Sequence, residues 1–309
     1  MSGIDWNSIA VGVGMTAVAH PFTYVKVLVQ LGHEPLAPIL RRNMFFRKQL
    51  QYPSVFAYIK HISNQDGYIG MYRGLFPRIC ANVSTSLTYS LVGKAVFVKA
   101  EFGSSLKSEA TRVSEECTEI KKVCDHTTRE MVARCSAVIV SQPFHVIAIR
   151  TMAEFVGQET IYTNIFTSTA EIYREEGILG FFSGLVPRLA GEIISIWLCN
   201  LLVHTFNTYI LTENNELKDM RQYSHMVMGY IAQIVTYPLS VTSTVMATTG
   251  SRITAGNPPF MPVYKGWVVC LRDLHKTGAS NRGSSMFFRK AVAHFNAASG
   301  VSPMPAPSM

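Results

Sequence analysis

The chain has 309 residues and a formal net charge of +8, yet only 16% of its residues are charged, against about 25% in a typical globular protein. Hydrophobic residues make up 48%, and the mean hydropathy is +0.18. This composition argues against an ordinary soluble protein, and 17 Phe, 13 Tyr and 3 Trp argue against a disordered chain. Six cysteines without a C-x-x-C pair do not suggest a disulfide scaffold. An integral membrane protein is the favoured class.

Five long helices are expected along the chain, each longer than the roughly 20 residues that cross a bilayer. They cover residues 8–31, 79–102, 131–155, 189–211 and 223–249. The first, third and fifth contain Pro21, Pro143 and Pro238, which we expect to kink them. The first 20 residues contain no Lys or Arg, so we expect an organelle address to be internal.

Shorter amphipathic segments are expected between these helices, at residues 54–65, 166–175 and 265–276. We interpret them as helices at the membrane surface. Residues 32–53 form an insertion rich in Pro and Arg. After Lys290 only 19 residues remain, with three prolines, so the sequence predicts no sixth span.

The chain contains an internal repeat, which indicates a repeated architecture. Asp66-Gly67-Tyr-Ile-Gly-Met-Tyr-Arg73-Gly74-Leu-Phe-Pro77-Arg78 matches Glu176-Gly177-Ile-Leu-Gly-Phe-Phe-Ser183-Gly184-Leu-Val-Pro187-Arg188 at an offset of 110. A shorter copy ends in Arg282-Gly283. Each copy follows one of the three proline motifs, His20-Pro21, Gln142-Pro143 and Tyr237-Pro238. The predicted units are 1–110, 111–222 and a truncated 223–290, followed by a polar tail at 291–309.

These repeated motifs resemble the mitochondrial carrier superfamily, in which three such units form a six-helix barrel with threefold pseudosymmetry. Further segments are similar to its divergent mitochondrial carrier homolog branch: Tyr-Val-Lys26-Val-Leu, Thr127-Thr-Arg-Glu-Met, Gln142-Pro-Phe-His-Val-Ile, Trp197-Leu-Cys-Asn and Met286-Phe-Phe-Arg-Lys. With the resemblance, the predicted fold is an all-α membrane protein. It has five membrane-spanning helices, lacks the sixth, and leaves a laterally open polar groove.

The chain departs from the solute carriers at the three proline motifs, whose acidic and basic residues close a carrier by salt bridges. The acidic positions here are Thr23, His145 and Ser240, and the basic positions are Lys26, Ala148 and Ser243. No acid–base pair can form at these degenerate gate positions. The alternative is a solute carrier with a redesigned gate.

Ionisable and polar groups inside membrane helices usually face the bundle interior or a water-filled cavity. Six residues are therefore candidates for lining the groove: Lys26, Asn82, His145, Arg150, Glu192 and Tyr237. For some of them a structural role is the alternative. Arg150 can sit at a membrane surface, Lys26 and Glu192 can pair with each other, and Tyr237 can be a packed aromatic residue.

The resemblance implies an insertase of the mitochondrial outer membrane for α-helical proteins, including tail-anchored ones. The implied partners are the lipid bilayer and client helices, with lipid scrambling as a companion activity. Docking of an apoptotic BH3-type protein and degenerate solute transport are the alternatives. No enzyme motif, cofactor motif or metal-ligand spacing is visible, and the scattered basic residues argue against nucleic acid binding.

Overall fold

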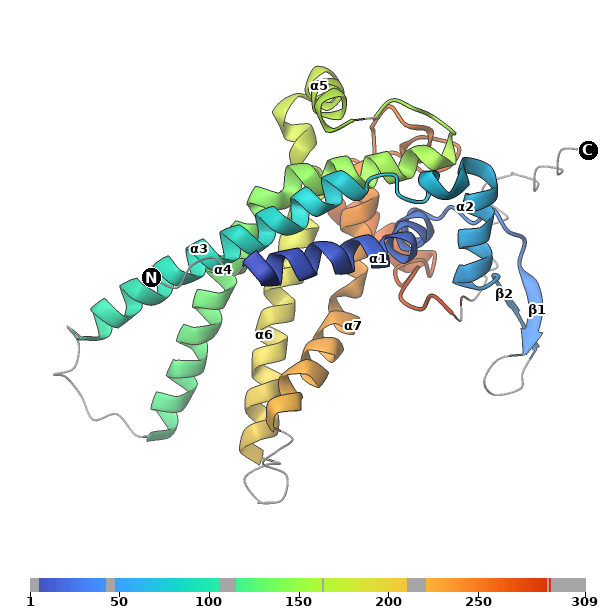
Figure 1. The fold of residues 1–309 in the computed structure, drawn as a ribbon. Helices are drawn as coiled ribbons and strands as arrows, with labels where there is room; N and C mark the ends of the chain where they lie inside the picture. The colour runs from blue at the N-terminus through green and yellow to red at the C-terminus, as the bar shows by residue number, and fades with distance from the viewer. Residues whose placement is uncertain are drawn as a thin grey trace, which may run out of the picture.

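The computed structural model describes residues 6–42, 48–105, 115–162, 164–209, 221–287 and 289, and these parts are mostly helical (Figure 1). They contain five helices of 25 residues or more: α1 (Trp6–Leu31), α3 (Leu75–Ser105), α4 (Glu115–Ala153), α6 (Leu185–Tyr209) and α7 (Arg221–Thr248). All five match predicted helices, although α4 begins at Glu115 rather than near Met131. Pro21, Pro143 and Pro238 lie inside α1, α4 and α7, as expected.

The three surface segments are also helical: α2 (Val55–Gly70), α5 (Ile165–Glu176) and α8 (Trp267–Lys276). The described residues also contain short 3-10 turns: η1 (Glu154–Val156), η2 (Gly177–Phe182) and η4 (Thr254–Gly256).

Among the described residues, three stretches are long and apolar enough to cross a membrane: Asn7–Leu31, Val123–Val156 and Ile165–Thr208. Helices α3 and α7 have the length but carry more polar residues. Five spans therefore remain a prediction. The expected absence of a sixth span also stays a prediction, since it concerns residues beyond Arg289, outside the described part of the chain.

The insertion in the first unit differs from the all-α expectation. Strands β1 (Ile39–Arg42) and β2 (Lys48–Gln51) form an antiparallel hairpin in which Leu40 lies opposite Leu50. Pro35 and Pro38 prevent α1 from continuing and favour extended backbone. The exposed N–H and C=O groups of that backbone then pair across the hairpin.

The kinked helices α1, α4 and α7 contact one another near their C-terminal ends and close one end of the fold. A repeated backbone contact makes this closure. Gly74, Gly184 and Gly283 adopt positive φ angles of 75°, 72° and 74°. Each approaches the kinked helix of the next unit at the former basic gate position, with the carbonyl oxygens of Ala148, Ser243 and Lys26, respectively, among its nearest atoms.

A second contact repeats in all three units and ties each kinked helix to its own repeat motif. His20 Nε2, Gln142 Nε2 and the Tyr237 hydroxyl donate hydrogen bonds to the carbonyl oxygens of Arg73, Ser183 and Arg282, at 2.8, 3.0 and 2.7 Å. The donor is always the residue before the proline, and the acceptor is the residue before the glycine. The degraded third copy therefore keeps the same local structure as the other two.

Candidate groove site

We call the side of the fold between α1 and α7 the open side, because the sequence predicts that the sixth helix is missing there. Figure 1 shows that the two helices diverge toward their N-termini, α1 running beside α3 and α7 descending beside α6. Along α7, Tyr223, Met226, Tyr230 and Ile234 form one stripe at helical spacing, and all four are exposed. Tyr230 and Ile234 also line a pocket shared with α1, so this stripe faces the open side.

That pocket, of about 230 Å³, lies where α1 and α7 converge. Its lining consists of Lys26, Tyr230, Gln233, Ile234, Tyr237, Asn281 and Ser284. The Lys26 ammonium lies 5.4 Å from the centre of the Tyr237 ring, a cation–π contact. The Tyr237 hydroxyl also accepts a hydrogen bond from Gln30 Nε2 at 3.1 Å. The structure thus brings two predicted groove residues, Lys26 and Tyr237, together.

Glu192 has a different partner from the one considered in the sequence. Its carboxylate lies 4.0 Å from Arg134 Nε, and the two side chains are 38% and 42% exposed. The Arg134 guanidinium also lies 5.4 Å from the centre of the Tyr89 ring on α3. This half-exposed pair joins α4 to α6 within an apolar stretch, which indicates contact with water or with another polar group.

Further along α4 and α6, Asn200 donates hydrogen bonds to Thr127 Oγ1 and Glu130 Oε2, both at 3.1 Å. With Arg134 and Glu192, these residues form a polar ladder between the two helices. Glu130 and Asn200 lie in two of the segments that carry the family resemblance, but they were not among the candidate groove residues. Their signal was a polar residue at helical spacing from Arg134 and Glu192 in an otherwise apolar helix.

Asn82 and His145 lie on α3 and α4. Asn82 is exposed and donates a hydrogen bond to Thr16 Oγ1 of α1 at 2.9 Å. His145 is half-buried, lies five residues before Arg150 on α4, and interacts electrostatically with Arg78 and Arg188.

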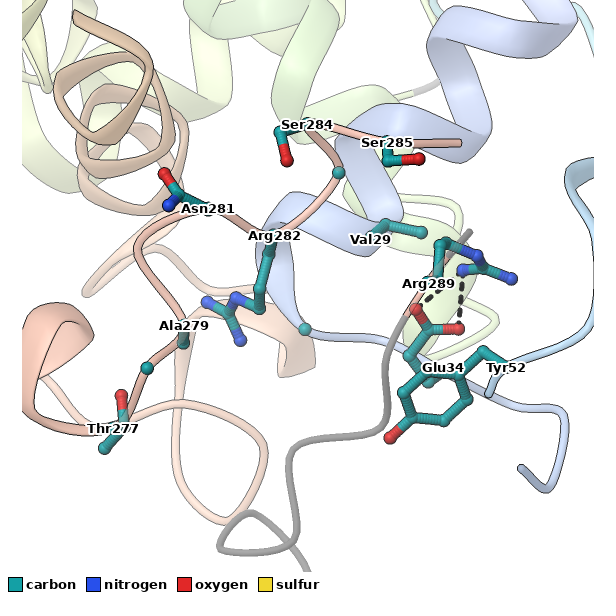
Figure 2. Close-up of a pocket in the computed structure, with 13 residues that line it drawn as sticks. Val29, Glu34, Tyr52, Thr277, Ala279, Asn281, Arg282, Ser284, Ser285 and Arg289 are labelled. Carbon is teal, nitrogen blue, oxygen red and sulfur yellow. Dashed lines mark hydrogen bonds and ion pairs between the residues drawn. The ribbon is translucent and has the colours of Figure 1, made fainter. Parts of the chain in front are cut away.

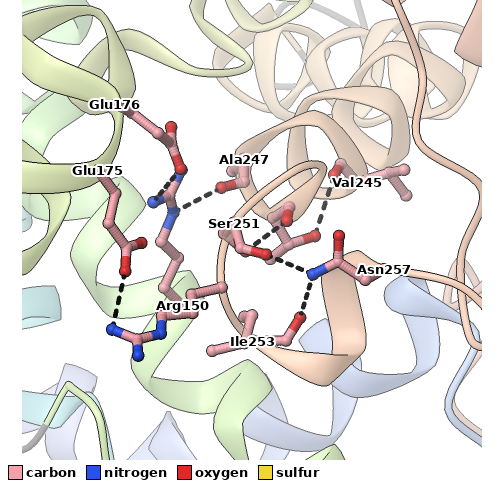
Figure 3. A network of polar contacts seen from close by, with 10 residues as sticks. Arg150, Glu175, Glu176, Val245, Ala247, Ser251, Ile253 and Asn257 are labelled. Carbon is pink, nitrogen blue, oxygen red and sulfur yellow. Dashed lines mark hydrogen bonds and ion pairs between the residues drawn. The ribbon is translucent and has the colours of Figure 1, made fainter.

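Arg150 lies in the protein interior with an exposed fraction of 0% (Figure 3). Its guanidinium contacts both Glu176 oxygens, at 2.8 and 2.9 Å, and donates from Nε to the carbonyl oxygen of Ala247 at 2.9 Å. It therefore links α4 to α5 and α7. Glu176 is the acid of the repeated acid–glycine motif, so this part of the motif supports the fold.

Apart from Lys26 and His145, the degenerate gate positions hold only neutral contacts. Thr23 Oγ1 donates to the Ala19 carbonyl oxygen at 3.2 Å, and Ser240 accepts from Thr244 through its carbonyl oxygen at 3.1 Å. Ala148 is buried, and Ser243 Oγ donates to the Gly184 carbonyl oxygen at 2.8 Å. Within the described ranges no ion pair joins the three kinked helices at this level.

A larger cavity of about 420 Å³ lies outside the spans, between the first and third units (Figure 2). Arg289 Nη1 contacts both Glu34 oxygens at 2.6 and 2.8 Å, and Nη2 donates to the Pro53 carbonyl oxygen at 2.6 Å. Burial raises the pKa of Glu34 to about 7, although the Arg289 charge opposes this shift. The parts of the chain that the structure describes contain no cluster of three or more metal-ligating side chains.

Known proteins resemble this chain over most of its length. The family model of the mitochondrial carrier proteins matches residues 7–96 and 125–214, the first two units. Mitochondrial carrier homolog 2 of Bos taurus is 42% identical over 286 residues, covering 92% of this chain and 93% of the relative. The human homolog 2 is 42% identical over 289 residues with the same coverage. Mitochondrial carrier homolog 1 of Mus musculus is 37% identical over 300 residues, covering 91% of this chain and 76% of the relative.

Proposed function

This chain belongs to the mitochondrial carrier family, in the branch of the mitochondrial carrier homologs, and on that premise we propose that it is an insertase of the mitochondrial outer membrane. Its clients are α-helical membrane proteins, including tail-anchored ones. The chain is a mitochondrial membrane protein with carrier repeats; the outer membrane, the clients and the insertion activity are the proposal.

The observation that carries the proposal is the half-exposed pair of Arg134 and Glu192 inside an open-sided bundle. A charge at the bilayer centre costs about 2.5–3.5 kcal/mol on insertion scales. Charges that stay half-exposed within these apolar stretches favour a hydrated interior over contact with lipid tails. The exposed apolar stripe of α7, next to the open side, offers an adjoining path into lipid.

Insertion requires both of these properties. The polar residues that flank a client helix must cross or enter the membrane, and a hydrated groove lowers that barrier. The apolar helix itself must leave sideways into the bilayer, which needs an open wall. The same groove offers a path for lipid headgroups, so lipid scrambling accompanies the insertase proposal.

Solute exchange is less well supported by this geometry. Alternating access needs a closed state that is favoured by a few kcal/mol and a means of opening it. Here the gate positions carry no acid–base pair, and Gly74, Gly184 and Gly283 hold the closed end through backbone contacts. Such contacts do not provide an ionic network that a small bound solute can exchange.

The test is insertion of a labelled tail-anchored client into liposomes that contain only the purified protein. We expect more protease-protected client than in empty liposomes. The amount of protected client should also rise with the amount of correctly oriented protein in the liposomes. No gain over empty liposomes contradicts an autonomous insertase. Saturable uptake of a small anion with no client insertion would instead favour the solute carrier, and stable capture of a BH3-type peptide without insertion would favour the receptor.

A further inference from the structure

Four basic side chains gather at the inner end of the groove, where the helices converge: Lys26 on α1, Arg78 on α3, His145 on α4 and Arg188 on α6. We call them the basic cluster. All four are half-buried. The charge of Arg78 acts on Lys26, His145 and Arg188, which places the four within one electrostatic environment. Arg78 and Arg188 occupy equivalent positions of the first two repeats.

The cluster has little compensating negative charge. Among the described residues, no carboxylate forms an ion pair with Lys26, Arg78 or Arg188. Lys26 faces the Tyr237 ring, and Arg188 Nη1 donates to the neutral Gln142 amide oxygen at 2.7 Å.

The nearby acid does not fill this gap. The carboxylate of Glu192 acts on Arg188, yet its ion-pair partner is Arg134. Partly buried cations without a counter-charge are costly inside a membrane protein. An anionic group from outside the chain would lower that cost.

A pocket at Lys26 gives an anionic group access to this member of the cluster. The pocket of about 230 Å³ at Lys26 is lined otherwise by uncharged residues and lies at the foot of the open side. Gln142 holds Arg188 in place, because its amide also donates to the Ser183 carbonyl oxygen at 3.0 Å. The guanidinium is thus oriented before any ligand arrives, which lowers the cost of binding.

We propose that the basic cluster selects the charge of the polar end that a client helix carries into the groove, favouring an anionic end over a cationic one. A C-terminal carboxylate with neighbouring Asp or Glu residues is the fitting chemistry. This inference rests on the proposed insertase function. Attraction between half-buried charges acts over several ångströms and is weakened by salt, so the preference decreases as ionic strength rises.

The test compares two tail-anchored clients that differ only in the residues after the apolar helix, acidic in one and basic in the other. Purified full-length protein is reconstituted in phosphatidylcholine liposomes, and protected client is measured for both. We expect the acidic client to insert about threefold or more better than the basic one. Arg78→Gln with Arg188→Gln should bring the ratio close to one.

Two further variants separate charge from structure. Arg78→Lys with Arg188→Lys keeps the charge and should keep the preference. Arg272→Gln with Lys276→Gln removes the same charge from the exposed face of α8 and should leave the ratio unchanged. Thermal unfolding of each variant shows whether the protein remains folded, and Arg78→Gln alone provides a milder change.

Four outcomes overturn the inference. Equal insertion of both clients removes the charge selection but leaves the insertase in place. A preference that persists in the double glutamine variant assigns it to other residues. A preference that disappears when phosphatidic acid is added to the liposomes assigns the cluster to lipid headgroups. Failure of both clients to insert removes the proposed function itself, and the inference with it.

Discussion

The Ser243 hydroxyl donates a 2.8 Å hydrogen bond to the carbonyl oxygen of Gly184. A residue at a former ionic gate position thus binds the repeat glycine of the preceding unit. Gly184 has a φ of +72°, and a Cβ atom there would overlap the Ser243 carbonyl oxygen. Close backbone approach has thus taken the place of a salt bridge. Gly74 of the first unit makes the equivalent approach to Ala148 of the second unit.

Gly184→Ala should therefore destabilise the protein strongly, because it combines left-handed strain with a backbone clash. We expect a loss of about 2–4 kcal/mol in unfolding free energy, measured by thermal or chemical unfolding in detergent. Gly250→Ala is the matched control, since Gly250 has a φ of +74° but nothing within 4 Å of its Cβ position. Equal losses in the two variants would refute the close-approach argument.

The bond from Tyr237 to the Arg282 carbonyl oxygen should contribute measurably to the closure of the third unit. Tyr237→Phe removes this 2.7 Å bond and the acceptor for Gln30, while the aromatic ring remains over Lys26. We expect a loss of about 1–2 kcal/mol. Tyr230→Phe, on the exposed stripe about two helical turns earlier, should change stability little. An unchanged stability of the Tyr237→Phe variant would mean that other contacts hold the kinked helix of the third unit to its repeat motif.

The pair of Arg150 and Glu176 should be one of the most sensitive polar contacts in the fold. Arg150→Met leaves the Glu176 carboxylate without its partner and removes the bond to Ala247. Breaking a buried pair from one side costs about 3–5 kcal/mol. Arg252 forms a more exposed pair with Glu175 at 3.4 Å, so Arg252→Met should cost at most about 1 kcal/mol. Similar unfolding temperatures for the two variants would contradict this ranking.

Two neighbouring groups outside the spans should give opposing pH dependences of stability. Burial lowers the pKa of His33 from 6.5 to about 4, and burial raises the pKa of Glu34 from 4.5 to about 7. The stability from neutral His33 is present above pH 6.5 and is lost as the pH falls toward 4. The stability from protonated Glu34 is present below pH 4.5 and is lost as the pH rises through 7.

These contributions largely cancel in the native chain, and single variants should reveal each one. His33→Gln should become more stable between pH 7 and pH 4.5 relative to the native chain, and Glu34→Gln should become less stable over the same interval. Each difference should be about 1–3 kcal/mol in unfolding curves at fixed ionic strength. Parallel pH profiles of both variants and the native chain would contradict the assigned pKa directions.

Sequence periodicity was sufficient to predict the helices and the repeat, because helix length, proline positions and glycine motifs are local properties. Which side chains pair between helices depends on tertiary packing, which a local sequence pattern does not show. The sequence suggested that Glu192 could pair with Lys26, whereas its partner is Arg134, and Arg150 was considered for the groove although it pairs with Glu176 in the interior. The hairpin escaped prediction because its two four-residue strands are too short to show a period.

The pair of Arg134 and Glu192 gives a direct test of the groove. Glu192→Arg places a second positive charge beside Arg134 and reverses the local potential, so client insertion should change by about threefold or more at constant protein level. Adding Arg134→Glu restores an opposite pair with exchanged positions. Insertion should return toward the native level in this double variant if the pair itself matters.

Lys26→Glu, in the pocket at the inner end of the groove, should change insertion even in the double variant, because it alters the potential of the groove without touching this pair. Native insertion in all three variants would exclude these charges from the route of the client.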